Sequence, residues 1–292
     1  MSLPGRFVDA TCGRIFVHRA GRGEPLVLIH GFFVSHWYFR HVLPRLAEKH
    51  DVIALDLPGF GESDRPAPDK FNYDLPSFAG VVAEVMDALS LPRADVLGHS
   101  MGGGVALTLA ARDPDRVSRL ALCCATVYPI AIPAEGKLLL QPVVGPFLWR
   151  HAFRKADIKR VMIRDQVRDP RFADDEFVDY YWARLNRPGG REATYASMQA
   201  IAALADSNAD PGRVTAPTLV LWADEDRIVP LAHGKRLQRA IAGAELRVVP
   251  ASGHMPFLER PDEFLRQLEP FLDAPAHRAQ VAPVPSSRSR AS

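Results

Sequence analysis

Residues 97–104 have the sequence LGHSMGGG, which places Ser100 among four glycines. A short apolar run precedes this stretch and an Ala- and Leu-rich run follows it, which predicts a strand, a turn at the serine and then a helix. Glycine inside a regular element loses more backbone entropy than any other residue. Several glycines together therefore indicate that the backbone here has no space for side chains. In a strand–turn–helix the residues two before and two after the serine must be small, and Gly98 and Gly102 hold those positions.

The pattern is G-x-S-x-G, which is typical of a nucleophile elbow. In an elbow the Oγ of Ser100 is exposed for attack, and the backbone N–H of Met101 lies at a helix N-terminus where it can bind an oxyanion. The alternative is a glycine-rich helix start in which Ser100 only caps the helix. Five-residue patterns also arise by chance, so features elsewhere in the chain are needed to choose between the elbow and the helix cap.

Composition limits the classes of protein to consider. The 292 residues are 47% hydrophobic and 24% charged, which fits a large α/β domain with an insertion. A net charge of +2 gives no broad electrostatic footprint for nucleic acid. Cys12, Cys123 and Cys124 are too few for a disulfide framework and are predicted to be small core residues in a reducing compartment. The N-terminus lacks a secretion signal and no apolar run is long enough to cross a bilayer, so we expect a cytoplasmic protein without stable membrane insertion.

Short apolar runs alternate with helical patterns over most of the chain. Residues 6–20 predict an antiparallel hairpin. Further strands are predicted within 26–31, 51–59, 94–100, 119–125, 218–224 and 245–254, and helices within 77–90, 101–112, 232–242 and 261–273. This alternation predicts an α/β fold with a mostly parallel sheet covered by helices on both faces.

Residues 127–213 break the alternation, because they hold helical patterns and no convincing strand. They predict an inserted helical cap between a first core segment, 1–126, and a second one, 214–274. Residues 275–292 are rich in Pro, Ser and Arg and are predicted to be disordered. We expect several apolar cap side chains to form helix core rather than pocket wall: Leu140, Val144, Phe147, Leu148, Trp149 and Trp182. The basic segment 150–168 is expected to be a solvated helix face, with attraction to membrane surfaces or anionic substrates as the alternative.

Polar residues follow three of the predicted strands, where the active sites of open α/β sheets lie. Ser100 follows the predicted strand 94–99, the acidic segment Asp224-Glu225-Asp226 follows 218–222, and His254 follows 245–250. The order Ser, acid, His is that of α/β-hydrolases. We predict Asp226 as the acid because it leads into the following loop, whereas Asp224 lies nearer the strand end and Glu225 is expected to be solvated.

The predicted roles follow from the chemistry of these groups. His254 would accept the proton of Ser100 and return it to the leaving group, and Asp226 would fix the imidazole tautomer. The alternative for His254 is a loop histidine that caps the next turn. A second oxyanion donor is predicted at the N–H of Phe32, aimed by a turn at Gly31. This role is compatible with Phe32 and Phe33 being core side chains.

Other polar residues are given structural or no chemical roles. His30 and His99 are predicted to be structural members of the site, because they end a strand and adjoin the nucleophile. No histidine-rich motif indicates a metal, and no metal or cofactor is expected.

Five segments together resemble the α/β-hydrolase superfamily over residues 6–273, specifically its capped group, which is similar to bacterial carboxylesterases and C–C bond hydrolases. They are HGFFVSHW (30–37), DLPGFGESDRP (56–66), GHSMGGGVAL (98–107), WADEDRIVP (222–230) and SGHMPFLERPDEF (252–264). The resemblance implies a catalytic triad with an oxyanion hole at two backbone N–H groups, supported by glycines. These residues are Ser100, Asp226 and His254 for the triad, Phe32 and Met101 for the oxyanion hole, and Gly31, Gly98 and Gly102 for the support.

The resemblance also bears on the substrate. Related dehalogenases and epoxide hydrolases carry Asp as nucleophile, so Ser100 argues against both activities. Related C–C hydrolases usually have a glycine-rich segment after the first His-Gly and a Trp after the catalytic His, whereas this chain has Phe32-Phe33 and Met255. The departure favours a carboxylesterase for small to medium hydrophobic esters. There are three alternatives: a C–C bond hydrolase of ring-fission diketones, a cofactor-free perhydrolase, and a ligand receptor of the same fold with little turnover. Arg227 and the cap arginines keep the first of these open.

Overall fold

The computed structural model describes residues 3–205 and 210–274, which form an eight-stranded sheet in the order β1-β2-β4-β3-β5-β6-β7-β8. The strands are β1 Arg6–Ala10, β2 Gly13–Ala20, β3 Glu24–Ile29, β4 His50–Leu55, β5 Ala94–His99, β6 Val117–Cys123, β7 Thr218–Ala223 and β8 Glu245–Val249. β2 pairs antiparallel with β1 and β4, and the remaining neighbours pair in parallel. The predicted hairpin and mostly parallel sheet are confirmed. The tail predicted to be disordered, 275–292, lies outside the described residues.

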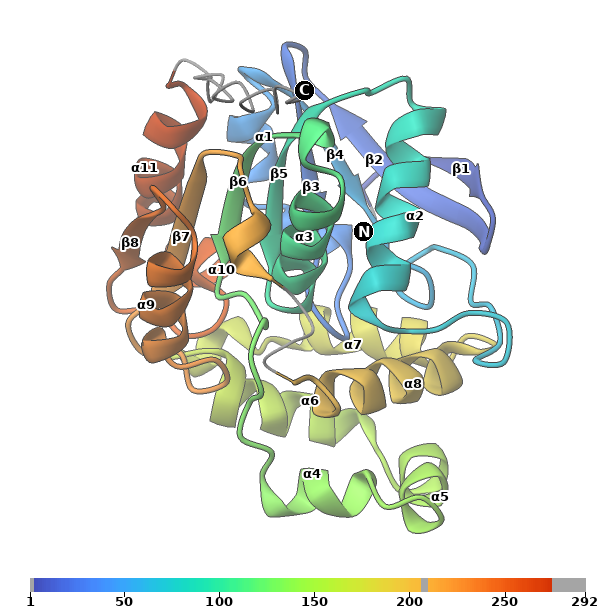
Figure 1. Cartoon of the computed structure of the whole chain (residues 1–292). Helices are drawn as coiled ribbons and strands as arrows, with labels where there is room; N and C mark the ends of the chain where they lie inside the picture. Colours follow the sequence, from blue (N-terminus) through green and yellow to red (C-terminus); the bar gives the residue numbers. More distant parts are fainter. Residues whose placement is uncertain (1–2, 206–209, 275–292) are drawn as a thin grey trace, which may run out of the picture.

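Helices cover this sheet (Figure 1). They are α1 Leu43–Leu46, α2 Leu75–Ala88, α3 Met101–Arg112, α9 Leu231–Ala240, α10 Pro256–Glu259 and α11 Pro261–Leu272, with short 3₁₀ turns η1 His36–Phe39, η2 Pro114–Arg116 and η5 Pro211–Arg213. α3 packs on β3, β5 and β6, and both α9 and α11 pack on β7 and β8. Because helices cover the central strands, β5 and β7 are buried along their whole length.

The stretch 127–213 is helical and carries no strand among its described residues. Its helices are α4 Ala134–Leu139, α5 Val144–His151, α6 Lys155–Val161, the π-helical turn η3 Met162–Gln166, the 3₁₀ turn η4 Pro170–Phe172, α7 Asp175–Leu185 and α8 Gly190–Ala202. Figure 1 shows them gathered beyond one end of the sheet, and we call them the cap. Across the described part of the chain, no helix combines the length and apolar character that a membrane span needs.

The cap side chains only partly follow the expectation of a helix core. Trp149 is buried and packs with Leu185 and Tyr195, and Leu140, Leu148 and Trp182 are half-buried. Val144 and Phe147 are exposed, at 46% and 64%, so their expected place in a helix core is wrong. The reason is that α5 contacts α4 and α8 and leaves its outer face uncovered.

Candidate active site

The nucleophile elbow forms where β5 ends and α3 begins. Ser100 has φ 54° and ψ −121°, a conformation that costs a residue with a side chain about 1–3 kcal/mol. Neighbouring backbone holds it there: the N–H of Ser100 donates to the carbonyl of Cys123 at 3.0 Å, and its carbonyl accepts the N–H of Thr126 at 2.9 Å. The strained serine is thus fixed by the end of the adjacent strand β6.

The glycines around the serine have the steric reason that the sequence predicts. A Cβ on Gly98 would lie 2.6 Å from the carbonyl carbon of Gly102, and one on Gly102 would lie 2.7 Å from that of Ile29. A Cβ on Gly31 would lie 3.0 Å from the Cβ of Ser100. A side chain at position 98 would push the end of β5 away from the start of α3, and one at position 31 or 102 would push the elbow away from the end of β3 and the loop after it.

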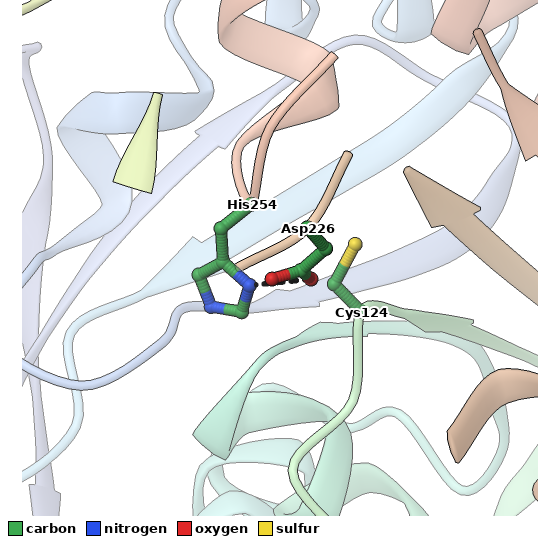
Figure 2. Close-up of side chains that lie close together, drawn as sticks. All are labelled: Cys124, Asp226 and His254. Atoms are coloured by element: carbon green, nitrogen blue, oxygen red, sulfur yellow. Dashed lines mark hydrogen bonds and ion pairs between the residues drawn. The ribbon is translucent and has the colours of Figure 1, made fainter. Parts of the chain in front are cut away.

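The structure brings Ser100, His254 and Asp226 into one hydrogen-bonded chain. The Oγ of Ser100 lies 2.9 Å from Nε2 of His254, and Nδ1 of His254 donates to Oδ2 of Asp226 at 2.7 Å (Figure 2 shows the second contact). The other oxygen of Asp226, Oδ1, accepts the N–H groups of Ile228 and Val229, both at 2.9 Å. All three members are buried, with less than a tenth of each residue's surface exposed.

The neighbouring acids lie elsewhere. Oδ1 of Asp224 accepts the N–H of Ser252 at 3.3 Å, and Oε1 of Glu225 accepts from Nε of Arg168 at 2.6 Å at an exposed position. Of the three acids that the sequence offers, Asp226 is therefore the one that contacts His254.

The oxyanion hole at Phe32 and Met101 stays a prediction. Met101 is the first residue of α3, so its N–H has no acceptor within the helix. Phe32 lines the same cavity as Ser100 and His254. A carbonyl oxygen of a bound substrate would lie between these two loops.

Buried His99 links three loops of the site. Its Nε2–H donates to the carbonyl of His254 at 2.7 Å, so its Nδ1 accepts the hydroxyl of Tyr38 at 2.8 Å. The Tyr38 oxygen in turn accepts the N–H of Gly31 at 2.9 Å. Burial holds the pKa of His99 well below its ordinary value, which keeps the ring neutral and the direction of these bonds fixed.

His30 supports the same loop. Its Nε2 accepts the N–H of Leu57 at 2.9 Å, and its Nδ1–H donates to the carbonyl of Gly31 at 2.7 Å. Burial lowers the pKa of His30 to about 4. These contacts agree with the structural role predicted for His30 and His99.

Ser100 and His254 open into a cavity of about 100 Å³. Two larger cavities share part of its lining: an apolar one of about 190 Å³ under the cap, and a wider one of about 480 Å³ beside α4 and η3. Phe32 and Gln166 line all three. A ligand at Ser100 therefore has two directions in which to extend.

With this geometry established, comparison with known proteins is informative. A family model described as the alpha/beta hydrolase fold matches residues 24–261. The chain belongs to the alpha/beta hydrolase family. It is 33% identical over 278 residues to 2-hydroxymuconate semialdehyde hydrolase of Pseudomonas sp. (strain CF600), which covers 92% of this chain and 93% of the relative. The predicted family and fold are confirmed.

Solved structures of other alpha/beta hydrolases superpose on most of this chain. The meta-cleavage product hydrolase from Pseudomonas fluorescens IP01 matches with a TM-score of 0.78 and 29% identity, over 92% of this chain and 97% of the other. A thermophilic esterase from Thermogutta terrifontis matches with a TM-score of 0.75 and 26% identity, over 91% and 98%. The chain is thus similar both to a meta-cleavage product hydrolase and to an esterase.

Cys124 lies close to Asp226 and His254 (Figure 2). Its sulfur and the nearest ligand atoms of Asp226 and His254 lie within 4.8 Å of one another. Burial raises the pKa of the Cys124 thiol well above its ordinary value, whereas a thiolate is the form that binds metals. The nitrogen and oxygen of the other two residues already bond each other, so the group is poorly suited to hold a metal.

Two polar residues that line the cavity, Thr126 and Gln166, were not identified from the sequence. Oγ1 of Thr126 lies 3.4 Å from Oγ of Ser100, and Gln166 of the cap lines the cavity. Thr126 follows strand β6 closely, so the rule that active sites gather at strand ends offers a signal for it. Gln166 has no such signal, because it lies in the inserted cap.

Proposed function

We propose that this alpha/beta hydrolase is a serine hydrolase of uncharged carboxylic esters with an apolar acyl group. The observation that carries the proposal is the hydrogen-bonded chain Ser100–His254–Asp226 opening into an uncharged cavity. Among the described residues that line this cavity and the apolar one beside it, none is Lys, Arg, Asp or Glu. Apolar pockets with a few placed polar groups suit small hydrophobic ligands.

The reaction follows from the hydrogen-bond directions. The Oγ of Ser100 attacks the ester carbonyl carbon while Nε2 of His254 takes its proton, and the N–H groups of Phe32 and Met101 stabilise the oxyanion. His254 then protonates the departing alcohol, which leaves an acyl-enzyme on Ser100. Water, deprotonated by His254, attacks this ester, and collapse of the second oxyanion releases the acid and restores Ser100. Asp226 stabilises the imidazolium that forms in each step.

The two side cavities suggest how an ester would lie. The apolar cavity is lined by residues such as Ile158, Phe177 and Met198 and suits the acyl chain. The wider cavity carries Arg164 and Arg227 on its wall and suits the alcohol, which leaves first. We therefore assign acyl selectivity to the cavity under the cap.

A second candidate is hydrolysis of a C–C bond in a ring-fission diketone. Similarity to 2-hydroxymuconate semialdehyde hydrolase and to the meta-cleavage product hydrolase supports it, and these relatives favour it over ester hydrolysis. Substrates of that type carry a carboxylate. Arg164 and Arg227 line the wider cavity rather than the catalytic one, and Arg164 already pairs with Glu135 and Asp165. The uncharged lining therefore favours the ester.

One screen tests both candidates. We would measure kcat/KM for p-nitrophenyl esters from acetate and butyrate to longer acyl chains, and for a vinylogous 1,5-diketone ring-fission product, with Ser100→Ala as control. We expect sustained ester turnover that Ser100→Ala abolishes. A diketone rate far above every ester rate would establish the second candidate instead. Tight ligand binding without turnover would indicate a receptor, and peracid formation from acetate and hydrogen peroxide would reveal perhydrolysis.

A further inference from the structure

We propose that Glu259 is a positioning residue that holds His254 in place by tying its loop to the end of the cap segment 162–169. The inference rests on the proposed role of His254 as the base. Glu259 is the last residue of α10 and is buried, with 7% of its surface exposed. Neither the proposed mechanism nor the fold otherwise accounts for a buried carboxylate at this place.

The carboxylate of Glu259 joins two segments that are far apart in the sequence. Oε1 accepts the N–H of Gly253, the residue directly before His254, at 2.7 Å. Oε2 accepts the N–H groups of Arg168 and Asp169 at 2.7 and 3.0 Å. Charge-assisted hydrogen bonds of this kind are about twice as strong as neutral ones. One side chain therefore fixes the base loop against the chain that leaves η3.

A second contact joins the same two segments. The N–H of His254 donates to the carbonyl of Gln166 at 2.8 Å. Gln166 is the last residue of the π-helical turn η3, and it also lines the catalytic cavity. Single π-helical turns are frequent at functional sites. The backbone of the base is thus anchored on a cap residue that a bound substrate would touch.

The close approach of the two segments explains why position 253 is a glycine. A Cβ there would lie 2.8 Å from the nitrogen of Arg168, and 2.9 Å from both the carbonyl oxygen of Gln166 and Oε1 of Glu259. Only a residue without a side chain leaves the junction closed.

Both oxygens of Glu259 are needed as acceptors, which makes a sharp test possible. In Glu259→Gln one oxygen is replaced by an NH₂ group that faces backbone N–H donors, so one side of the junction opens while the side-chain volume is kept. The matched control is Glu263→Gln, because Glu263 contacts side chains of its own helix, Arg266 and Gln267. We would measure kcat and KM for p-nitrophenyl butyrate, and hydrogen exchange of peptides that cover 164–170 and 250–256.

We expect Glu259→Gln to lower kcat about 10- to 100-fold, since a misplacement of about 1 Å costs up to about 10²-fold. KM should change less than about threefold, because the cavity lining is intact. Both peptides should exchange about tenfold faster or more, and Glu263→Gln should match the wild type. Three results from a folded Glu259→Gln protein would overturn the proposal. They are an unchanged kcat, an unchanged rate of hydrogen exchange in either peptide, and a KM that changes by the same factor as kcat.

A second variant keeps the test decisive if Glu259→Gln does not fold. Gly253→Ala pushes the same junction apart and leaves Glu259 in place, so it should give the same selective loss of kcat, and an unchanged kcat would overturn the proposal. If the wild type turns over no ester, the rate at which a fluorophosphonate labels Ser100 replaces kcat. Faster exchange of both peptides with slower labelling would then support the role of Glu259 while the ester function fails.

Discussion

The change Asp226→Asn tests the predicted acid, because the surrounding backbone fixes how an asparagine would lie. The oxygen that faces Ile228 and Val229 accepts two N–H groups at 2.9 Å, so the amide oxygen takes that place. The amide NH₂ then faces Nδ1 of His254, which must accept. The ring proton therefore moves to Nε2, toward Ser100, where the base has to be unprotonated.

The magnitude follows from the cost of the opposite orientation. Turning the amide would leave the two N–H groups without an acceptor, at about 1–3 kcal/mol each, or roughly 2–6 kcal/mol together. Since about 1.4 kcal/mol is a factor of ten, the competent arrangement is depleted roughly 30- to 20,000-fold. Serine proteases lose about 10⁴-fold on the equivalent change. We expect kcat/KM to fall by about 10²- to 10⁴-fold.

The assay is the initial rate with p-nitrophenyl butyrate at pH 8, with circular dichroism and Tm to show that each variant is folded. Asp224→Asn is the matched control. Its carboxylate makes a long 3.3 Å contact with the N–H of Ser252, and we expect kcat/KM within about threefold of the wild type. If Asp226→Asn is silent while Asp224→Asn is inactive, the assignment of the acid is wrong.

Three further predictions concern selectivity, stability and lipid. Ile158→Trp fills the apolar cavity and should lower the ratio of the octanoate rate to the butyrate rate about tenfold. The control Ile163→Trp, at an exposed position, should leave this ratio unchanged. If Ile158→Trp also leaves it unchanged, the apolar cavity does not bind the acyl chain. Burial lowers the pKa of His30 from 6.5 to about 4, so between these pH values the unfolded chain binds a proton at His30 that the folded protein does not. The contribution of neutral His30 to the free energy of unfolding is therefore fully present above pH 6.5. It is lost as the pH falls toward 4, by up to about 1.4 kcal/mol per pH unit. Urea unfolding should show a shallower pH slope in His30→Asn, and equal slopes would contradict this. Acidic neighbours pair most cations of segment 150–168, so liposome sedimentation should show no pelleting that depends on anionic lipid; such pelleting would revive the membrane alternative.

The fold, and the meeting of Ser100, His254 and Asp226 at one place, were predictable because their signals are local. The spacing of Gly98 and Gly102 around Ser100 reflects contacts within one turn of chain and with the neighbouring loop. The strands carry apolar runs of their own, and Asp226 and His254 each follow such a run directly. The order of the three residues along the chain then identifies the family.

The contacts that complete the site were not predictable, because they join distant segments. The N–H of His254 meets a carbonyl of the cap at Gln166, and Glu259 meets Arg168 across much of the sequence. No periodicity or motif encodes such a meeting. The exposure of Phe147 has the same cause: a helical pattern marks which side chains are apolar, but the neighbouring helices decide which of them are covered.

The difference between locally encoded residues and contacts that join distant segments also bears on the choice of substrate. An ester and a diketone would both use the proposed nucleophile, acid and base, so similarity in the loops that carry them does not separate the two substrates. The substrate is selected by the cavity lining, which comes largely from the cap and from the loop after β3 at Phe32. A carboxylate bound in that uncharged lining would lose its water without a charged partner, at a cost of several kcal/mol. Because about 1.4 kcal/mol is tenfold, a neutral ester of the same size should be favoured by about 10²-fold or more, unless the substrate reaches the arginines of the wider cavity.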